Sequence, residues 1–386
     1  MNRLTAVALT LLLVGCSEAP DTGNPPAGFS CPTSVDKPMA LAVGARANVP
    51  KPKIPAAVQD LMTGVARARA DVTVIRVDGD PKVVFDAPPP PREGNENADG
   101  LVLEEHLNAI AAAYRDQTPA RAPEADPLTA LTVAGKRVGP GGTIALVDSG
   151  LQTTPPLRFD EEPLLSAEPA EVAAYLEQEK LLPDLSERTV LLIGLGETAA
   201  PQPRLDNRWS ANLVAIWTAV AEAAGACVEA LPLGETTDAV VSTPGVAVVT
   251  PPAPPPPLTP CGEVELGEAD NVSFLPDSAE FKDRDAARTT LGQLASVVRA
   301  KNQRVELIGR TASSGSVPGR VALSAQRAEA VKGTLVELGV AADRITTRGV
   351  GSDWPTHVPD VGAGGVLLPG PAAQNRKVVV KLTCEG

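Results

Sequence analysis

The proline-rich stretch Thr250–Pro260, which reads TPPAPPPPLTP, limits what this chain can fold into more than any other feature. Proline has no backbone N–H to donate, and its ring fixes φ, so consecutive prolines form an extended polyproline II segment rather than part of a sheet. At 386 residues the chain is long enough for two domains. The sequence therefore predicts one domain before this stretch and another after it, with a linker at residues 250–260.

The first residues, MNRLTAVALTLLLVGC, have the pattern of an export signal. Arg3 supplies a positive charge, and Leu4–Val14 is an apolar run that is too short to span a bilayer. Leu13–Cys16 (LVGC) resembles a lipobox, the motif that directs diacylglycerol, with acyl chains such as palmitate, onto a cysteine. An ordinary signal peptide with a chance cysteine is the alternative. The sequence predicts a signal peptide at 1–16 and a protein anchored to a membrane through Cys16.

The residues after the signal indicate location and partners. Ser17 rather than aspartate follows the lipidation site, a choice that favours the outer membrane in enteric bacteria. We expect a cell-envelope lipoprotein of the outer membrane if the host has two membranes, and otherwise of the outer face of the plasma membrane. Residues 17–56 are rich in Pro, Gly and small polar residues and predict a tether. The net charge of −13 argues against nucleic acid as a partner.

Residues 57–249 predict an α/β domain, because short apolar runs alternate with amphipathic segments. Turn residues separate the first two runs, which indicates a hairpin. The predicted strands are Val72–Val77, Lys82–Phe85, Thr143–Val147, Val190–Ile193, Cys227–Leu231 and Val246–Val249, and the predicted helices include residues 103–114, 171–181 and 213–220. Strands that are apolar throughout belong to a mostly parallel sheet with helices on both faces.

The order of elements is similar to that of von Willebrand factor A-type domains, which hold a metal through D-x-S-x-S after the first strand. The corresponding loops here begin at Asp78 (DGDP) and Asp148 (DSGLQT), and neither has the serine spacing. Gly194–Ala199 (GLGETA) matches the dinucleotide pattern G-x-G-x-x-A, but AAPQPRLDN follows it instead of the helix that a pyrophosphate needs. We therefore predict no metal, no other cofactor and no catalytic residues, and a domain that binds an unidentified protein partner.

The alternative hypothesis makes the N-terminal domain an enzyme or a nucleotide-binding domain. The strand ends at Asp78, Asp148 and Gly194–Thr198 would then converge on one edge of the sheet as a ligand site. On this hypothesis the C-terminal domain is a degenerate structural module.

Residues 261–386 predict a smaller α/β sandwich with helices on one face of its sheet. The predicted elements are an entering strand and turn at Asn271–Phe281, a helix with the stripe Ala287, Leu291, Leu294 and Val298, a strand at Arg304–Ile308, a helix opening at Leu323, a turn at Ile345–Gly351 and a last strand at Asn375–Leu382.

Three motifs follow one another in this domain: GRTASSG at Gly309–Gly315, LSAQRA at Leu323–Ala328 and NRKV at Asn375–Val378. They resemble the OmpA-like C-terminal (OmpA/Pal/MotB) domain family, whose pattern is G-H-T-D-x-x-G, L-S-x-x-R-A and N-R-R-V. The resemblance extends from about Val264 to Leu382. It implies a non-enzymatic module that binds a peptidoglycan stem peptide of the diaminopimelate type, or a related wall component.

The resemblance also implies a set of binding residues. In the family, an aspartate of T-D-x-x-G accepts hydrogen bonds from the diaminopimelate ammonium, and the arginine of L-S-x-x-R-A meets a carboxylate. Here Thr311 and Ala312 occupy the T-D position, and Arg327 occupies the arginine position, which we expect near a helix N-terminus. Asn375 and Arg376 occupy the late N-R position and are expected to line the same site.

Ala312 in place of aspartate removes the acceptor for the ammonium group. Arg310 stands where the family usually has histidine, which is expected to add a cation, while Ser313 and Ser314 could accept weakly. Three interpretations stay open: retained stem-peptide binding, an altered envelope ligand, and a purely structural module.

The cysteines predict the covalent framework. Lipidation of Cys16 leaves Cys31, Cys227, Cys261 and Cys384, and in an exported chain these predict two disulfides with three possible connectivities. Cys261 lies just before the C-terminal domain and Cys384 just after its last strand, so we predict that they pair, leaving Cys31 with Cys227. Buried free thiols are the alternative.

Overall fold

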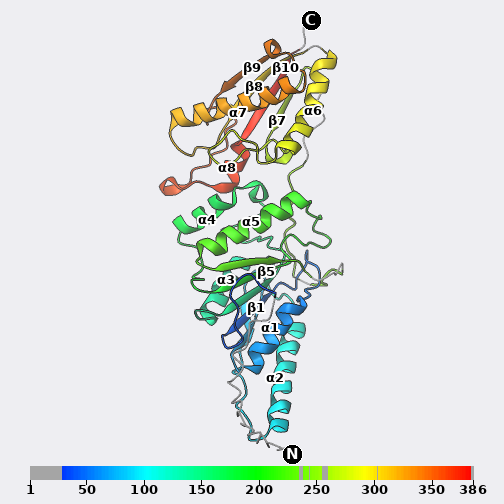
Figure 1. The fold of residues 1–386 in the computed structure, drawn as a ribbon, viewed down its shortest axis with the longest axis vertical. Coiled ribbons are helices and arrows are strands. Elements are labelled where there is room, and N and C mark those ends of the chain that lie inside the picture. Colours follow the sequence, from blue (N-terminus) through cyan, green and yellow to red (C-terminus); the bar gives the residue numbers. More distant parts are fainter. Residues whose placement is uncertain (1–27, 234–237, 243, 254–259, 302, 384–386) are drawn as a thin grey trace, which may run out of the picture.

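The computed structural model describes residues 28–383 apart from 234–237, 243, 254–259 and 302. The predicted signal peptide, Cys16, much of the linker and Cys384 lie outside the described residues. The molecule is elongated, with an N-terminal domain at one end and a C-terminal domain stacked on its helices α4 (Pro169–Gln178) and α5 (Asn207–Ala223) (Figure 1). No helix in the described part of the chain is long and apolar enough to cross a membrane.

The N-terminal domain is built on a six-stranded sheet with the order β3-β2-β1-β4-β5-β6. All strands are parallel except β3, which pairs antiparallel with β2, so the predicted hairpin and mostly parallel sheet are confirmed. The strands are β1 (Met39–Val43), β2 (Val72–Arg76), β3 (Lys82–Phe85), β4 (Thr143–Val147), β5 (Thr189–Ile193) and β6 (Cys227–Leu231).

Helices cover both faces of this sheet, as predicted. Along β1, Ala40 and Ala42 pack toward α3, α4 and α5, whereas Leu41 and Val43 pack toward α1 and α2. A strand buried on both faces needs apolar residues at every position, which is why its sequence shows no alternation. The remaining helices of this domain are α1 (Ala56–Arg67), α2 (Glu96–Asp116) and α3 (Pro127–Arg137).

Two expectations for this domain are wrong. The predicted tether at 17–56 contains β1, which lies between β2 and β4, so the folded domain starts well before residue 57. The predicted strand Val246–Val249 is irregular instead. The backbone of Val249 forms its hydrogen bonds with the side chain of Gln202 instead of with a neighbouring strand. The Gln202 amide accepts from the Val249 N–H at 2.8 Å and donates to the Val249 carbonyl at 2.7 Å.

The C-terminal domain has a four-stranded sheet with the order β7-β10-β8-β9. One face of the sheet packs against two helices, α6 and α7, around a single apolar core, which confirms the predicted sandwich. The elements are β7 (Glu263–Leu266), α6 (Arg284–Lys301), β8 (Arg304–Arg310), α7 (Val317–Glu337), β9 (Ile345–Gly349), α8 (Pro369–Asn375) and β10 (Lys377–Thr383).

Three boundaries in this domain differ from the prediction. The first strand is β7, not Asn271–Phe281, and the expected turn at 345–351 is largely the strand β9, which pairs parallel with β8. Helix α7 begins at Val317 rather than at Leu323. The Ser316 hydroxyl caps it by accepting from the Gly319 N–H, and the proline after Val317 suits a first helical turn.

Cys31 and Cys227 form a disulfide with an S–S distance of 2.10 Å, which confirms that pairing. The bond joins the segment before β1 to the edge strand β6. Cys261 is also disulfide-bonded. Since Cys384 lies outside the described residues, its pairing with Cys261 stays a prediction.

We predict that the double variant Cys31→Ser/Cys227→Ser destabilises the N-terminal domain by about 2–5 kcal/mol, because the bond closes a long loop. The two cysteines are 196 residues apart in the sequence. Urea unfolding followed by tryptophan fluorescence in a Trp354→Phe background measures the effect, since Trp209 and Trp217 lie in the N-terminal core. An unchanged unfolding midpoint would contradict the prediction.

Candidate functional site

A cavity of about 420 Å³ lies where the C-terminal domain meets α4. The loop after β8, the first half of α7 and the segment that follows β7 form most of its wall. Its charged lining residues are Glu168, Glu171, Asp277, Arg320, Arg327 and Arg376. Three carboxylates facing three guanidinium groups make it suited to a ligand that carries charges of both signs.

Four of the five predicted binding residues meet in this cavity. Thr311, Ala312, Arg327 and Arg376 all belong to its lining, although Arg376 is distant in sequence from the others. Asn375 does not line it. The motifs thus place four of the five residues on one cavity, and the binding role of these residues stays a prediction.

Arg327 is held in place by the backbone of the segment opposite α7. Its Nε donates to the Ser278 carbonyl at 2.8 Å and its Nη2 to the Leu275 carbonyl at 3.3 Å, while the guanidinium lies 5.1 Å from the centre of the Phe274 ring. Burial, and then the neighbouring charge of Arg376, lower the pKa of Arg327 to about 10. It thus stays a cation at neutral pH.

The expectation that Arg327 lies near a helix N-terminus is wrong. Because α7 already begins at Val317, Arg327 sits in its middle. A helix dipole acts mainly within the terminal turn. The positive charge at this position is therefore that of the guanidinium alone, without a contribution from the helix dipole.

Backbone and side-chain bonds fix the loop that carries Thr311 and Ala312. The Thr311 N–H donates to the Gly351 carbonyl at 2.8 Å, and Arg320 donates to the carbonyls of Ser313 and Gly315 at 3.0 and 2.7 Å. Ala312 itself is only 3% exposed. The loop is fixed, and the residue at the position of the family's aspartate carries no carboxylate.

Asn375 supports that loop and does not line the cavity, contrary to the expectation from the motif. The side chain is buried and donates to the Val358 carbonyl at 2.8 Å and to Asp360 Oδ2 at 3.0 Å. Asp360 Oδ2 in turn accepts from the Ser313 N–H at 2.9 Å. An amide that bridges two segments in this way positions the loop.

Arg310 does not add a cation to the cavity, contrary to expectation. Its Nη1 lies 2.8 Å from Glu265 Oε1, and its guanidinium lies 5.1 Å from the centre of the Trp354 ring. Arg310 is absent from the cavity lining. Its charge is instead paired with Glu265 of β7.

Two carboxylates of the cavity lining, Glu168 and Glu171, come from the N-terminal domain and were not predicted from the sequence. Glu168 is the N-cap residue of α4 and Glu171 lies in its first turn. Glu171 forms an ion pair with Arg376, and Glu168 Oε1 lies 2.6 Å from Nζ of Lys282. Burial raises the pKa of Glu171, and the Arg376 guanidinium offsets part of that effect. No local pattern could have revealed a contact between residues so distant in sequence.

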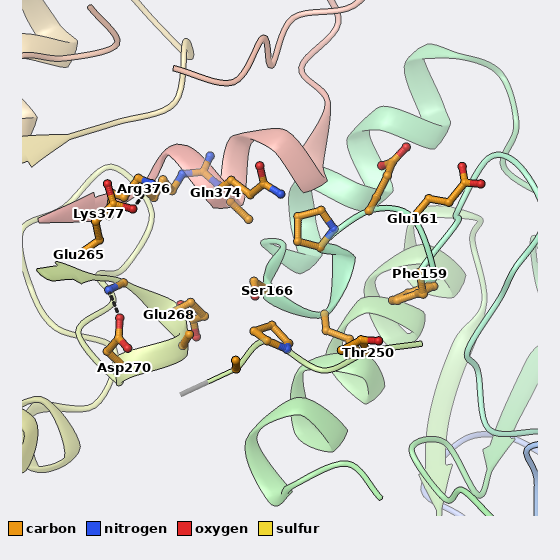
Figure 2. A pocket seen from close by; sticks show the side chains of 18 of the residues that line it. Phe159, Glu161, Ser166, Thr250, Glu265, Glu268, Asp270, Gln374, Arg376 and Lys377 are labelled. Atoms are coloured by element: carbon orange, nitrogen blue, oxygen red, sulfur yellow. Dashed lines mark hydrogen bonds and ion pairs between the residues drawn. The ribbon is translucent and has the colours of Figure 1, made fainter. Parts of the chain in front are cut away.

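The two domains also meet around a second cavity, of about 760 Å³. Arg376 and Lys377 lie on its C-terminal side, and Phe159 and Glu161 lie across from them (Figure 2). Arg376 lines both cavities. The larger cavity is bounded on the N-terminal side by the acidic loop before α4, whereas Thr311, Ala312 and Arg327 line only the smaller one.

Direct bonds hold the domains against each other beside these cavities. Arg208 Nη1, from α5, donates to the carbonyls of Glu268 and Ala269 and to the Asn271 side chain, each at 2.9 Å. Helix α8 packs on α4 and on the short helix Leu164–Ser166. The position of α4 relative to the loop that carries Thr311 and Ala312 is therefore set by a defined interface.

The carboxyl edge of the N-terminal sheet, where the alternative hypothesis places a ligand site, is filled. Asp148 pairs with Arg46 after β4, with their side chains 0% and 1% exposed. Asp78 accepts from Arg76 Nε at 2.7 Å and from the Arg121 N–H at 2.9 Å. Burial raises the pKa of Asp78, but these and further backbone hydrogen bonds outweigh it and lower the pKa overall.

Little room is left at this edge. The cavity beside Asp148 and Gly194 measures about 10 Å³. The chain reaches its next helix, α5, only at Asn207, so no helix N-terminus follows Gly194 directly. Among the residues that the structure describes, no three His, Cys, Asp or Glu side chains lie together as metal ligands would.

Comparison with known proteins identifies the C-terminal domain. Residues 273–359 match the model of the OmpA family. This chain carries an OmpA family domain. The match includes the loop that carries Thr311 and Ala312 and all of α7, and it stops before Arg376.

One curated relative and several solved structures are similar to this domain. The probable lipoprotein YiaD of Escherichia coli K12 is 34% identical over 119 residues, which is 31% of this chain and 50% of that protein. The chain thus spans half the length of this relative. The periplasmic domain of Helicobacter pylori MotB is 19% identical with a TM-score of 0.26, over 32% of this chain and 76% of that one. The peptidoglycan-associated lipoprotein of Burkholderia pseudomallei is 24% identical with a TM-score of 0.24, over 28% and 86%.

We predict that Asp148→Ala destabilises the N-terminal domain by about 3–5 kcal/mol, because it leaves the buried Arg46 without its counter-charge. The matched control is Arg46→Met/Asp148→Leu, which removes both charges and should cost much less. Urea unfolding of the two variants measures the difference. A single variant no less stable than the double one would contradict the structural role of the pair.

Proposed function

We propose that this protein is a lipid-anchored, non-enzymatic component of the bacterial cell envelope whose OmpA family domain binds peptidoglycan. The observation that carries the proposal is the cavity of about 420 Å³ that brings Thr311, Ala312, Arg327 and Arg376 together. They come from three separate motifs, and the resemblance to the family implies that these positions hold the wall ligand. The domain match and the relationship to a probable lipoprotein support the same conclusion.

The proposed ligand is the stem peptide of the diaminopimelate type. Its diaminopimelate residue ends in an ammonium and a carboxylate, and a cavity with guanidinium and carboxylate groups offers partners for both. Arg327 presents a planar, permanently charged group that suits a carboxylate. An altered envelope ligand is the second candidate, and Ala312 is the specific observation that favours it.

The N-terminal domain is proposed to bind a partner rather than to catalyse a reaction. A reaction site needs a cavity that admits a substrate and excludes water. The sheet edge where open α/β sheets usually bind ligands is filled by the pair Arg46–Asp148. The helices α4 and α5 instead contact the OmpA family domain (Figure 1).

Wall binding is tested with the full chain in soluble form and purified peptidoglycan. We predict that Arg327→Ala removes most binding and that Ala312→Asp strengthens it about ten- to a hundredfold, since a charged hydrogen bond contributes about 1.5–3 kcal/mol. Arg310→Gln is the matched control, because this arginine lies outside the cavity and should leave binding unchanged. Circular dichroism of each variant checks that the fold is retained.

Two results would contradict this proposal. One is a wild-type chain that does not sediment with peptidoglycan and gains nothing from Ala312→Asp, which would make the domain a structural module. The other is an equal loss of binding in Arg327→Ala and Arg310→Gln, which would indicate general charge attraction instead of a defined site.

Membrane anchoring is tested separately at Cys16. We predict that Cys16→Ser releases the protein into the soluble fraction, because the acyl chains supply nearly all of the membrane affinity. Fractionation of cells that express each form measures this. If the variant still sediments with membranes after peptidoglycan has been digested, the lipid anchor is not what holds the protein there.

A further inference from the structure

Two of the three acidic residues in the proposed wall-binding cavity come from the N-terminal domain. Glu168 and Glu171 open α4 of the N-terminal domain, yet they line the same cavity as Arg327 and Arg376. Asp277 is the one carboxylate that the OmpA family domain itself adds to this lining. The position that holds the aspartate in the family is the buried, uncharged Ala312.

The ion pair between the two domains is only half satisfied. Glu171 uses Oε1 to accept from Nη2 of Arg376, while Glu171 Oε2 and Arg376 Nη1 are buried without a hydrogen-bond partner among the described residues. These two atoms are enclosed, whereas the exposed parts of the two side chains, 26% of Glu171 and 21% of Arg376, line the cavity. A carboxylate and a guanidinium side by side on a cavity wall match a ligand group that has both an ammonium and a carboxylate.

A third unpaired atom lies in the same lining. The Thr311 side chain is 4% exposed, and its Oγ1 is buried without a partner in the part of the chain that the structure describes. Thr311 stands immediately before Ala312 on the binding loop. Arg320, which also lines the cavity, has its Nε buried without a partner among the described residues. Buried polar atoms in native proteins are nearly always paired, so four unpaired atoms on the residues around one cavity favour a site for a polar ligand.

We propose that α4 supplies the acidic half of the wall-binding site, with Glu171 accepting the ligand ammonium in place of the carboxylate that Ala312 lacks. Glu168 lies one turn away and adds negative charge, while Arg376 and Arg327 face the ligand carboxylate. The binding site is then composite, and neither domain contains all of it. This inference rests on the proposed function, because it names residues that recognise the same wall ligand.

The interface makes such a composite site possible. Lys282 of the OmpA family domain holds Glu168 at 2.6 Å, and Arg208 of the N-terminal domain donates three hydrogen bonds across the junction. These contacts fix the start of α4 beside the binding loop. A carboxylate placed by a rigid element can replace one on the loop, because the ligand responds to the position of the charge and not to its origin in the sequence.

The experiment uses the full chain carrying Cys16→Ser and two synthetic peptides, L-Ala-γ-D-Glu-meso-diaminopimelate and the same peptide acetylated on its distal amine. Isothermal titration calorimetry measures the affinity for each. We expect the wild-type site to prefer the free amine by about tenfold or more, because acetylation removes the ammonium that Glu171 recognises.

Glu171→Gln is the decisive variant. Its amide oxygen can still accept from Arg376, so the interface should persist, but the negative charge is gone. We expect it to bind the free-amine peptide at least tenfold more weakly and to lose its preference over the acetylated peptide. Glu177→Gln is the matched control, since Glu177 lies on the exposed face of the same helix. Ala312→Asp in the Glu171→Gln background should restore the preference.

The outcomes separate this inference from the proposed function. If the wild-type chain binds peptidoglycan and the free-amine peptide but Glu171→Gln keeps the full preference, the composite site is wrong and wall binding stands. If Glu171→Gln binds more tightly, α4 competes with the ligand, which also overturns the inference. If the wild-type chain binds neither peptidoglycan nor peptide, both the proposed function and the inference fail.

Discussion

Arg376 is the residue on which the rest of the arrangement depends. It follows α8, lines both cavities at the junction, and pairs with Glu171 of the other domain. A partly buried ion pair of this kind is strongly sensitive to geometry, because desolvation offsets much of its attraction unless further hydrogen bonds are made. The pair between Glu171 and Arg376 therefore stabilises the junction only if the interface holds α4 in position. The position of α4 and α5 in turn depends on their packing against the N-terminal sheet.

The sequence predicted the helices and strands correctly where the hydrophobic pattern of a single segment is enough to identify the element. Apolar runs identified β2, β4 and β5, and helical stripes identified α5 and α6, because burial imposes those periods directly. It failed at β1, whose short run MALAV stands among prolines and small polar residues typical of a tether. It failed also at β9, where the exposed Thr346 and Arg348 and the closing Gly349 suggest a turn, although pairing with β8 decides otherwise.

The candidate site was predictable to the extent that its residues lie in family motifs. Arg327 and Ala312 were found because LSAQRA and GRTASSG are contiguous. The roles of Asn375 and Arg310 were not predicted correctly, because a motif gives the position of a residue in the sequence but not the direction of its side chain. The place of Glu171 in the site could not be predicted from the sequence, because its contact with Arg376 exists only after the two domains have packed together.

The two places where the N-terminal domain could act differ in access. At the carboxyl edge of the sheet, Arg46 Nε is unpaired among the described residues, yet the cavity there holds only about 10 Å³, so no ligand can reach it. At the start of α4, the Glu171 side chain is 26% exposed and lines a cavity of about 420 Å³. An unpaired buried atom is costly wherever it lies, but only the second place presents a charged side chain to a cavity that a ligand can enter. The functional surface of this α/β domain is therefore expected at its junction with the OmpA family domain, away from the edge where open sheets usually bind their ligands.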